Sequence, residues 1–428
     1  MKEYPYWRDQ SPAPQSSVDS RLSTAGSGRH DVVVVGAGYT GLSAARTLAR
    51  AGADVLVLER EEVGSGASAR NAGQVLTGLK LDPTTLVRQY GARRARQLFD
   101  AADRAIAGLE TLIGDEGIEC QYERVGHIQA AASASHFKEL RSQQAILERV
   151  FDQRVELVSR ADQRTELGSD LYHGLLIDER SGALNPARYV HGLAAAATRA
   201  GARLAIGVAA LRASRASHGW TVSTSSGKVE ARDVLFATNG YTDRAAPFLQ
   251  RRYLPIGSYI VVTAPLPPDA AASLLPRRRT AFDSKHFLHY FRLTADRRLL
   301  FGGRAEFSRP SEGTTRRAAE ILRRDMERVF PQLSGIAIDY AWGGLVAFTR
   351  DQLPHAGRLE GLFYAGGYCG HGIAMATSLG EAIGRRIAGE PVEHPLFDDR
   401  FPAIPMYTGN PWFLPVVGAY YRLRDFVG

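Results

Sequence analysis

The sequence predicts an α/β fold with two domains, of which the first is assembled from discontinuous segments. Three observations predict it. A strand, a glycine turn, a helix and a second strand follow one another within residues 31–58. Two later apolar strands, at 233–237 and 362–365, each run into a turn of small residues. Two stretches of different character, 83–180 and 251–330, interrupt these elements and predict a second domain of mixed β-sheet and helices.

The elements are predicted from the residue pattern in chain order. The β-branched run 31–35 predicts a buried strand, which the helix 40–51 and a second strand at 54–58 follow. Asn185 before Pro186 is typical of the start of a helix, here 186–199. Apolar spacing predicts further helices at 86–112, 130–150, 314–329 and 373–388. Alternating or β-branched runs predict strands at 203–206, 220–224, 233–237, 259–263, 287–292, 298–301 and 362–365.

The composition excludes several classes of protein. The net charge of +8 comes from scattered arginines, whereas nucleic-acid binding would require a coherent basic patch. The two cysteines, Cys120 and Cys369, cannot form a disulfide framework or a metal cluster, so we expect no metal site and a reducing, cytoplasmic location. No apolar run reaches the roughly 18 residues that span a bilayer. Residues 1–30 lack the apolar core of a signal peptide and are predicted to form an N-terminal arm.

The strongest motif is the glycine pattern Gly36, Gly38 and Gly41, which follows a strand and opens a helix. This is the context that a dinucleotide fingerprint requires. Gly36 permits the tight turn, Gly38 admits the pyrophosphate, and Gly41 lets the helix pack on the strand. Glu59, at the end of the second strand, is placed to accept hydrogen bonds from the adenosine ribose and argues against NADP. We therefore predict a bound dinucleotide.

The stretch from Gly64 to Gln74 is rich in Gly, Ser and Ala and comes directly after the second strand. A loop so poor in side chains can lie flat against a large planar ligand. Arg70 is a candidate for a phosphate, and Asn71 or Gln74 for the edge of a flavin ring. The alternative is a flexible surface loop.

Two later turns complete the predicted site. The strand 233–237 runs into the turn Thr238-Asn239-Gly240. In flavin sites built from two segments, a strand of this kind ends beside the pyrophosphate of the cofactor. The glycines between 366 and 372 precede a helix, whose N-terminus favours negative charge at the flavin pyrimidine. His371 is either a residue of the flavin site or a polar turn residue. Cys369 is either a covalent flavin anchor or, as we expect, a small buried residue.

The predicted sites follow from these motifs. The catalytic candidates are His371 together with His289 and Arg292, from a stretch expected to cover the flavin. The predicted cofactor-binding residues are Gly36, Gly38, Tyr39, Thr40, Gly41, Glu59, Arg60, Ser65, Ala67, Ser68, Arg70, Asn71, Ala72, Gly73, Gln74, Val208, Ala237, Thr238, Asn239, Gly240, Gly344, Gly367, Cys369, Gly370, Gly372, Ile373 and Ala374.

Four motifs together resemble the D-amino-acid oxidase superfamily of FAD oxidoreductases, and within it the γ-glutamylputrescine oxidoreductase branch. They are the loop near residue 70, the Ala-Thr-Asn-Gly-Tyr turn ending at Tyr241, the Leu-His-Tyr-Phe-Arg-Leu-Thr stretch from Leu288, and the Gly-Tyr-Cys-Gly-His-Gly turn from Gly367. The tail from Asn410 is similar to that branch as well. The resemblance covers nearly the whole chain from residue 31.

The resemblance implies a discontinuous Rossmann-like FAD-binding domain, formed by 31–82, 181–250 and 331–395. It also implies a substrate domain formed by 83–180 and 251–330, with 396–428 as a C-terminal tail. The activity it implies is oxidation of the C–N bond of an amine or amino acid to an imine by hydride transfer to flavin N5, with O2 as the usual acceptor. The partners are then a small amine and an electron acceptor, with no nucleic acid and no transmembrane segment.

Three positions depart from the sarcosine oxidases of this superfamily. Ala374 stands where a lysine pairs with the substrate carboxylate, and Leu300 stands at the position of an oxygen-activating lysine. The cysteine that anchors the flavin falls near Gly344, so the FAD is expected to be non-covalent. These departures favour an alkyl amine or a γ-glutamyl amine over N-methylglycine and leave oxidase or dehydrogenase activity open.

Three other functions stay open. A glycine or D-amino-acid oxidase would need Arg292 or Arg304 for the carboxylate. A flavin monooxygenase would need a second nucleotide fingerprint for NADPH, and none is apparent. The last alternative is a flavin-binding protein without turnover, against which the intact Gly-His-Gly turn argues.

Overall fold

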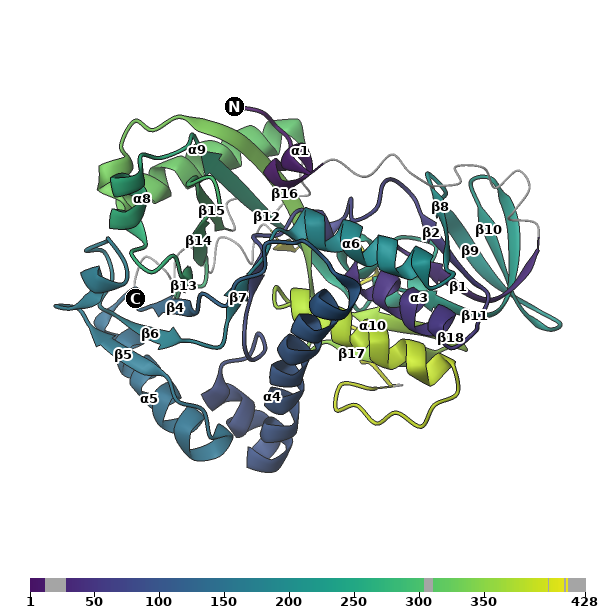
Figure 1. The fold of residues 1–428 in the computed structure, drawn as a ribbon. Coiled ribbons are helices and arrows are strands. Elements are labelled where there is room, and N and C mark those ends of the chain that lie inside the picture. The colour runs from purple at the N-terminus through teal and green to yellow at the C-terminus, as the bar shows by residue number, and fades with distance from the viewer. Residues whose placement is uncertain (12–27, 304–310, 399, 412, 415–428) are drawn as a thin grey trace.

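The computed structural model describes residues 1–11, 28–303, 311–398, 400–411 and 413–414. It confirms the mixed α/β class, with two large sheets that lie side by side (Figure 1). The first contains β17 (His355–Leu359), β18 (Leu362–Gly366), β11 (Gly227–Phe236), β1 (Arg29–Val35), β2 (Val55–Glu59) and β8 (Arg203–Ile206), in that spatial order. The strands from β18 to β8 run parallel, and β17 pairs antiparallel with β18.

An antiparallel extension leaves the first sheet at β11. It consists of β10 (Gly219–Thr224), which pairs with β11, and β9 (Ala210–Ala216), which pairs with β10. The alternation of side chains along β1 explains how the sheet is covered. Val32 and Val34 pack into the core with α3 (Tyr39–Arg50) and α10 (Ile373–Ile387), whereas Val33 and Val35 pack on the opposite face. Helix α6 (Pro186–Arg199) lies beside α3 (Figure 1).

The second sheet holds the remaining long strands. Its order is β16 (Ile338–Phe348), β12 (Leu254–Thr263), β15 (Leu299–Gly303), β14 (His289–Leu293), β13 (Thr280–Asp283), β4 (His127–Ala130), β6 (Gly174–Asp178) and β5 (Glu156–Ser159). Helix α9 (Glu312–Val329) packs on β12, β15 and β16. The other helices are α4 (Pro83–Glu116), α5 (Ala134–Phe151), α7 (Pro247–Gln250) and α8 (Pro268–Leu274). A small sheet pairs β3 (Gln74–Val75) with β7 (Gly182–Ala183).

The predicted helix over 130–150 is wrong at its start. Residues 127–130 form the strand β4, and Ser133 caps the helix by accepting a hydrogen bond from the backbone N–H of His136 at 3.3 Å. A serine at this position stops the helix from extending backwards because its side chain satisfies an N–H of the first turn. None of the described helices has an apolar stretch long enough to cross a bilayer.

The N-terminal segment differs from the predicted arm. Residues 6–10 form helix α1 (Tyr6–Gln10; Figure 1). Its side chains Tyr6 and Trp7 are buried. Residues 12–27 lie outside the described part, as do Arg304 and most of the predicted C-terminal motif. Residues 338–348 were predicted within the FAD-binding segment 331–395. In the structure they form β16, which pairs with β12 at the edge of the second sheet.

Candidate functional site

A cavity of about 1080 Å³ is lined by both large sheets. Val35 and Phe236 reach it from the first sheet, and Ser258 and Tyr290 from the second. The loop 64–74 and the turn 368–373 form further walls. The glycine fingerprint, the loop and the two later turns, which are far apart in the sequence, therefore converge on one space.

The fingerprint turn is built as its glycines require. Gly36 has a φ of +105°, which disfavours any residue with a Cβ. A Cβ at Gly41 would lie 1.9 Å from the backbone oxygen of Gly36, so only glycine lets α3 approach the strand this closely. The N-terminus of α3 consequently opens onto the cavity at Gly38 and Tyr39, where its N–H groups favour an anion.

Glu59 forms one end of the cavity and is held in a defined orientation. Its carboxylate accepts hydrogen bonds from the backbone N–H of Ala37 at 2.8 Å and of Glu61 at 3.0 Å. The neighbouring Arg60 also lines the cavity and donates to Asp243 at 2.9 Å. Val208 does not line the cavity; its backbone N–H donates to the carbonyl of Glu59 at 2.8 Å.

The loop after β2 is cross-linked by its own polar side chains. Arg70, predicted to meet a phosphate, donates instead to the carbonyls of Ser65 at 2.6 Å and Gly343 at 3.3 Å. The amide of Asn71 donates to the carbonyls of Ala67 and Ser68 and accepts from the N–H of Gly73. Both side chains still line the cavity, so their polar atoms shape its wall while they hold the loop.

Gln74 is tied to the second sheet in the same way. Its amide donates to the carbonyls of Ala281 and Phe291, both at 3.2 Å. Ser68 accepts a hydrogen bond from the N–H of Tyr39 at 3.1 Å and so joins the loop to the first turn of α3. The loop is therefore a fixed wall between the two sheets.

The two later turns are joined to each other and to the fingerprint. The side-chain oxygen of Asn239 accepts from the N–H of Gly367 at 2.8 Å, and the hydroxyls of Tyr368 and Thr40 are 2.6 Å apart. Cys369 is buried beside Thr349, and burial raises the pKa of its thiol to about 11. A protonated, buried thiol agrees with the prediction of a small packing residue.

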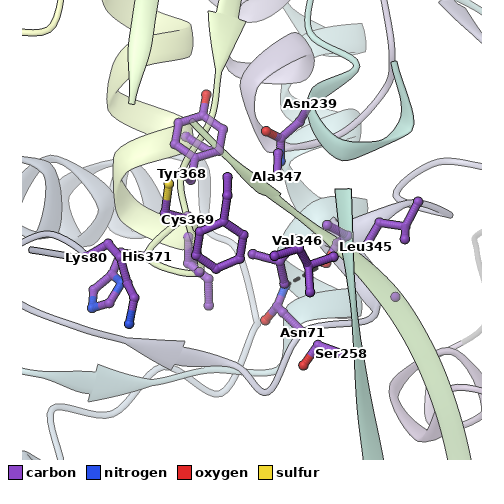
Figure 2. Close-up of a pocket in the computed structure, with 18 of the residues that line it drawn as sticks. Asn71, Lys80, Asn239, Ser258, Leu345, Val346, Ala347, Tyr368, Cys369 and His371 are labelled. Carbon is purple, nitrogen blue, oxygen red and sulfur yellow. Dashed lines mark hydrogen bonds between the residues drawn. The ribbon is translucent and has the colours of Figure 1, made fainter. Parts of the chain in front are cut away.

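His371 precedes α10 and lines the cavity. Its backbone N–H donates to the carbonyl of Tyr368 at 2.9 Å, and its Nδ1 is buried without a hydrogen-bond partner among the described residues. Burial, followed by the charges of Lys80 and His127, lowers its pKa to about 3. The imidazole is therefore neutral, and it lies beside Lys80 at one side of the pocket (Figure 2).

The other two catalytic candidates lie outside the cavity lining. The ring of His289 is held between Asp283 at 3.1 Å and Asp325 at 3.2 Å. Burial alone would lower the pKa of His289, but these two hydrogen bonds raise it to about 9. The guanidinium of Arg292 donates to the carbonyls of Gly73 at 2.9 Å and Leu184 at 3.0 Å, and burial lowers its pKa to about 10. Both residues thus hold neighbouring structure in place.

The structure places most of the predicted cofactor residues on the cavity wall. The exceptions are Gly41, Gly73, Val208, Gly240, Gly367 and Ala374, which pack behind it. Sequence reasoning missed Leu345, Val346 and Ala347 on β16, together with Lys80 and His127 (Figure 2 shows all but His127). Hydrophobic side chains and a lone lysine carry no motif, so no signal in one sequence would have found them.

The geometry fits an extended dinucleotide. An oriented carboxylate stands at one end, the N-terminus of α3 in the middle, and the N-terminus of α10 beyond it, at Gly372 and Ile373. A Cβ at Gly38 would come within 2.9 Å of the Ser68 hydroxyl, and both residues line the cavity, so a side chain at Gly38 would crowd this part of the wall.

Comparison with known proteins identifies the family. A family model described as FAD dependent oxidoreductase matches residues 31–386. The chain is 34% identical over 403 residues to γ-glutamylputrescine oxidoreductase of Escherichia coli K12, covering 93% of each chain. Its fold is similar to that of glycine oxidase from Geobacillus kaustophilus, with a TM-score of 0.71 and 22% identity over 86% of this chain and 96% of that one.

L-proline dehydrogenase from P. horikoshii has a similar fold as well, with a TM-score of 0.70 and 19% identity over 86% of this chain and 96% of that one. These two likenesses show the fold, and the family match shows the cofactor. The chain belongs to the family of FAD-dependent oxidoreductases, and it is an FAD-dependent enzyme.

Proposed function

We propose that this enzyme oxidises the C–N bond of an amine of the γ-glutamylputrescine type to an imine, with O2 as the acceptor. The similarity to γ-glutamylputrescine oxidoreductase, over 93% of both chains, carries the proposal. Bound FAD supplies the hydride acceptor. We expect the FAD to be held without a covalent link, because Gly344 stands where sarcosine oxidases carry their anchoring cysteine and has no side chain to bond the flavin.

The cavity supports a substrate that is long and polar. Beyond the glycine turn its wall continues along β4 and α5, where Gln129, His136, Glu139 and Gln143 line it. A site that only had to hold glycine, an amino acid of two carbons, would not need this length. Polar groups at intervals along a cavity fix the orientation of an extended ligand.

The residues near the glycine turn have a positioning role in this proposal. The N-terminus of α10, where Gly372 and Ile373 line the cavity, would stabilise negative charge on bound FAD. His371 adds a neutral imidazole that donates or accepts one hydrogen bond there. The apolar Leu345 and Val346 exclude water from the same space. Hydride transfer requires a neutral amine, and no strong protein base is needed for it.

Anaerobic mixing of the holoenzyme with a panel of amines tests the proposal. The panel contains γ-glutamylputrescine, putrescine, glycine, sarcosine and D-alanine, and the rate of bleaching of the visible FAD absorbance is measured for each. We expect γ-glutamylputrescine to reduce the flavin fastest. If glycine, sarcosine or D-alanine ranks first, the enzyme is an amino-acid oxidase and the proposal is wrong.

The acceptor is tested on the reduced enzyme. Reoxidation by O2 is compared with reoxidation by a one-electron dye. Leu300, at the position expected for an oxygen-activating lysine, is fully buried in β15 and does not line the cavity. Fast reoxidation by O2 supports an oxidase, whereas reoxidation by the dye alone shows a dehydrogenase.

A further inference from the structure

One stretch of the cavity wall is built from apolar side chains of the second sheet. Leu254 and Ile256 of β12 lie opposite Phe348 and Val346 of β16 in the strand pairing. Alternate residues of a strand share a face, so the four side chains lie on one face of the sheet, and all four line the cavity. None of the four is fully buried, so each keeps apolar surface that a ligand can cover.

The C-terminal segment brings two further apolar residues to the cavity. Tyr407 donates a hydrogen bond to the carbonyl of Tyr253 at 3.2 Å, directly before Leu254. Its ring also contacts the ring of Phe413, with the two centroids 6.1 Å apart. Phe413 and Leu414 both line the cavity, and Phe413 keeps part of its surface exposed. The end of the described chain therefore adds to the wall that begins at β12.

Backbone contacts fix the position of this segment. The N–H of Ile404 donates to the carbonyl of Arg251 at 3.0 Å, and the guanidinium of Arg252 donates to the carbonyl of Phe401 at 2.5 Å. Both partners on the body of the protein come just before β12. The segment is thus held beside the start of this strand at several points, and its place at the cavity does not depend on one side chain.

The apolar stretch adjoins the turn that we assign to the flavin. The N–H of Cys369 donates to the carbonyl of Ala347 at 3.1 Å, and Ala347 lies between Val346 and Phe348 on β16. A substrate whose reacting carbon lies at the flavin can therefore extend along this stretch. Apolar side chains offer no charge and no hydrogen bond, so they bind a ligand by removing its apolar surface from water.

We propose that this stretch is a subsite for the methylene chain of the amine substrate, and that the C-terminal segment is a determinant of chain length. The subsite, which we call the apolar wall, consists of Leu254, Ile256, Val346, Phe348, Phe413 and Leu414. The inference rests on the proposed function and narrows it to amines whose reacting carbon belongs to a run of methylenes. γ-Glutamylputrescine has such a run between its amide and its amine, whereas glycine and sarcosine do not.

The test varies the number of methylenes and nothing else in the ligand. The γ-glutamyl amides of ethylenediamine, propanediamine, putrescine and cadaverine are mixed anaerobically with the FAD holoenzyme. The rate of FAD bleaching against concentration gives an apparent dissociation constant and a limiting rate for each. The variants are Phe413→Ala, Leu414→Ala and Ile256→Ala. Met406→Ala is the matched control, because Met406 belongs to the same segment, is 95% exposed and does not line the cavity.

We expect the apparent dissociation constant of the wild type to fall by about 4-fold for each methylene from ethylenediamine to putrescine, the effect of burying one methylene. In Phe413→Ala and Leu414→Ala this gain should drop to about 2-fold or less, because part of the chain then stays in contact with water. The shortest amide should bind these variants nearly as it binds the wild type. Met406→Ala should keep the full dependence on chain length.

Three results would overturn the apolar wall. They are an unchanged dependence on chain length in the variants, an equal loss of affinity for all four amides, and loss of FAD from folded Phe413→Ala, which would assign the wall to the cofactor. Ile256→Ala decides if the two C-terminal variants do not fold, since it removes apolar surface from β12. If the variants behave as the wild type while γ-glutamylputrescine still reduces the wild type fastest in the amine panel, the subsite is wrong and the proposed function stands. If glycine, sarcosine or D-alanine ranks first in that panel, the proposed function is wrong and the subsite falls with it.

Discussion

Two histidines of this enzyme, His371 and His289, are held in opposite charge states by their surroundings. For His371, burial is the largest influence and leaves the ring neutral with a pKa of about 3. His289 touches two carboxylates, which offset the cost of burial and raise its pKa to about 9. Both were catalytic candidates by sequence, and only the packing of distant residues distinguishes them. That information was not available from the local pattern.

The stability of the protein should depend on pH through His289. The pKa of His289 rises from 6.5 to about 9 on folding. Its contribution to the free energy of unfolding is therefore complete below pH 6.5 and is lost as the pH rises through about 9. The full contribution is about 3 kcal/mol. We expect His289→Gln to remove this pH dependence, as measured by urea unfolding at pH 6 and pH 9.5 with excess FAD. His218→Gln, at an exposed position, is the control. An identical slope in His289→Gln and wild type would contradict the two-carboxylate arrangement.

The prediction for Gly38 rests on a steric clash and not on backbone conformation. Its φ of −94° is open to any residue, but a Cβ would meet the hydroxyl of Ser68 at 2.9 Å and project into the passage for the pyrophosphate. Gly38→Val should therefore fold and lose nearly all bound FAD, measured as the ratio of flavin to protein absorbance. Gly108→Val is the matched control, because a Cβ at Gly108 meets nothing within 4 Å. Full FAD occupancy in Gly38→Val would reject the assignment of this turn.

At the scale of elements, the strands and helices of the fingerprint unit could be predicted nearly to the residue. The β-branched run before Gly36 became β1, and Asn185 caps α6 by accepting from the N–H groups of Ala187 and Arg188. Such elements follow from local chemistry, so a single sequence is enough to find them. The fold class and the expectation of bound FAD followed from them.

Strand β16 shows what could not be predicted. Its centre contains Gly343 and Gly344, and glycine inside a strand argues against that assignment when only the sequence is seen. The strand forms because ten of its residues pair with β12, between Leu254 and Thr263. Long-range pairing thus overrides local propensity. The cavity residues Leu345 to Ala347 were missed for the same reason.

Helix α1 gives the prediction that belongs to this scale. The indole N–H of Trp7 donates to the carbonyl of Asn71 at 2.9 Å, and the guanidinium of Arg292 lies 5.6 Å from the centre of the Trp7 ring. Tyr6 donates to Asp296 at 2.6 Å. The N-terminal helix therefore supports the loop that lines the cavity at Asn71.

We expect Trp7→Phe to weaken FAD binding, because it keeps the aromatic packing and leaves the Asn71 carbonyl without its donor. The loss should be about 1–3 kcal/mol, shared between folding and FAD affinity. Titration of the apoprotein with FAD and thermal unfolding of the holoenzyme measure the two parts. Trp220→Phe, whose indole nitrogen has no hydrogen-bond partner among the described residues, is the control. Equal FAD affinity and stability in Trp7→Phe and wild type would show that α1 does not support the loop.

At the scale of the whole molecule, the cavity that we assign to the cofactor is lined by both large sheets. Residues of β1 and β11 line it from one sheet, and residues of β12, β14 and β16 from the other. A ligand that contacts both sheets binds the folded protein and not the unfolded chain. Bound FAD must therefore stabilise the molecule as a unit.

This coupling predicts how the cofactor can be removed and what its removal does. Acid precipitation should release FAD into the supernatant, because Gly344 stands where sarcosine oxidases carry the cysteine that anchors the flavin. With free FAD at 100 times its dissociation constant, the folded state gains about 2.7 kcal/mol, which raises Tm by roughly 3 °C for a chain of this length. Calorimetry of the apoprotein with and without FAD measures the shift.

Because the cofactor joins both sheets, the holoenzyme should unfold in one transition. Flavin retained in the acid pellet would show a covalent link, and an FAD-independent Tm would show that the cavity does not bind the cofactor across both sheets.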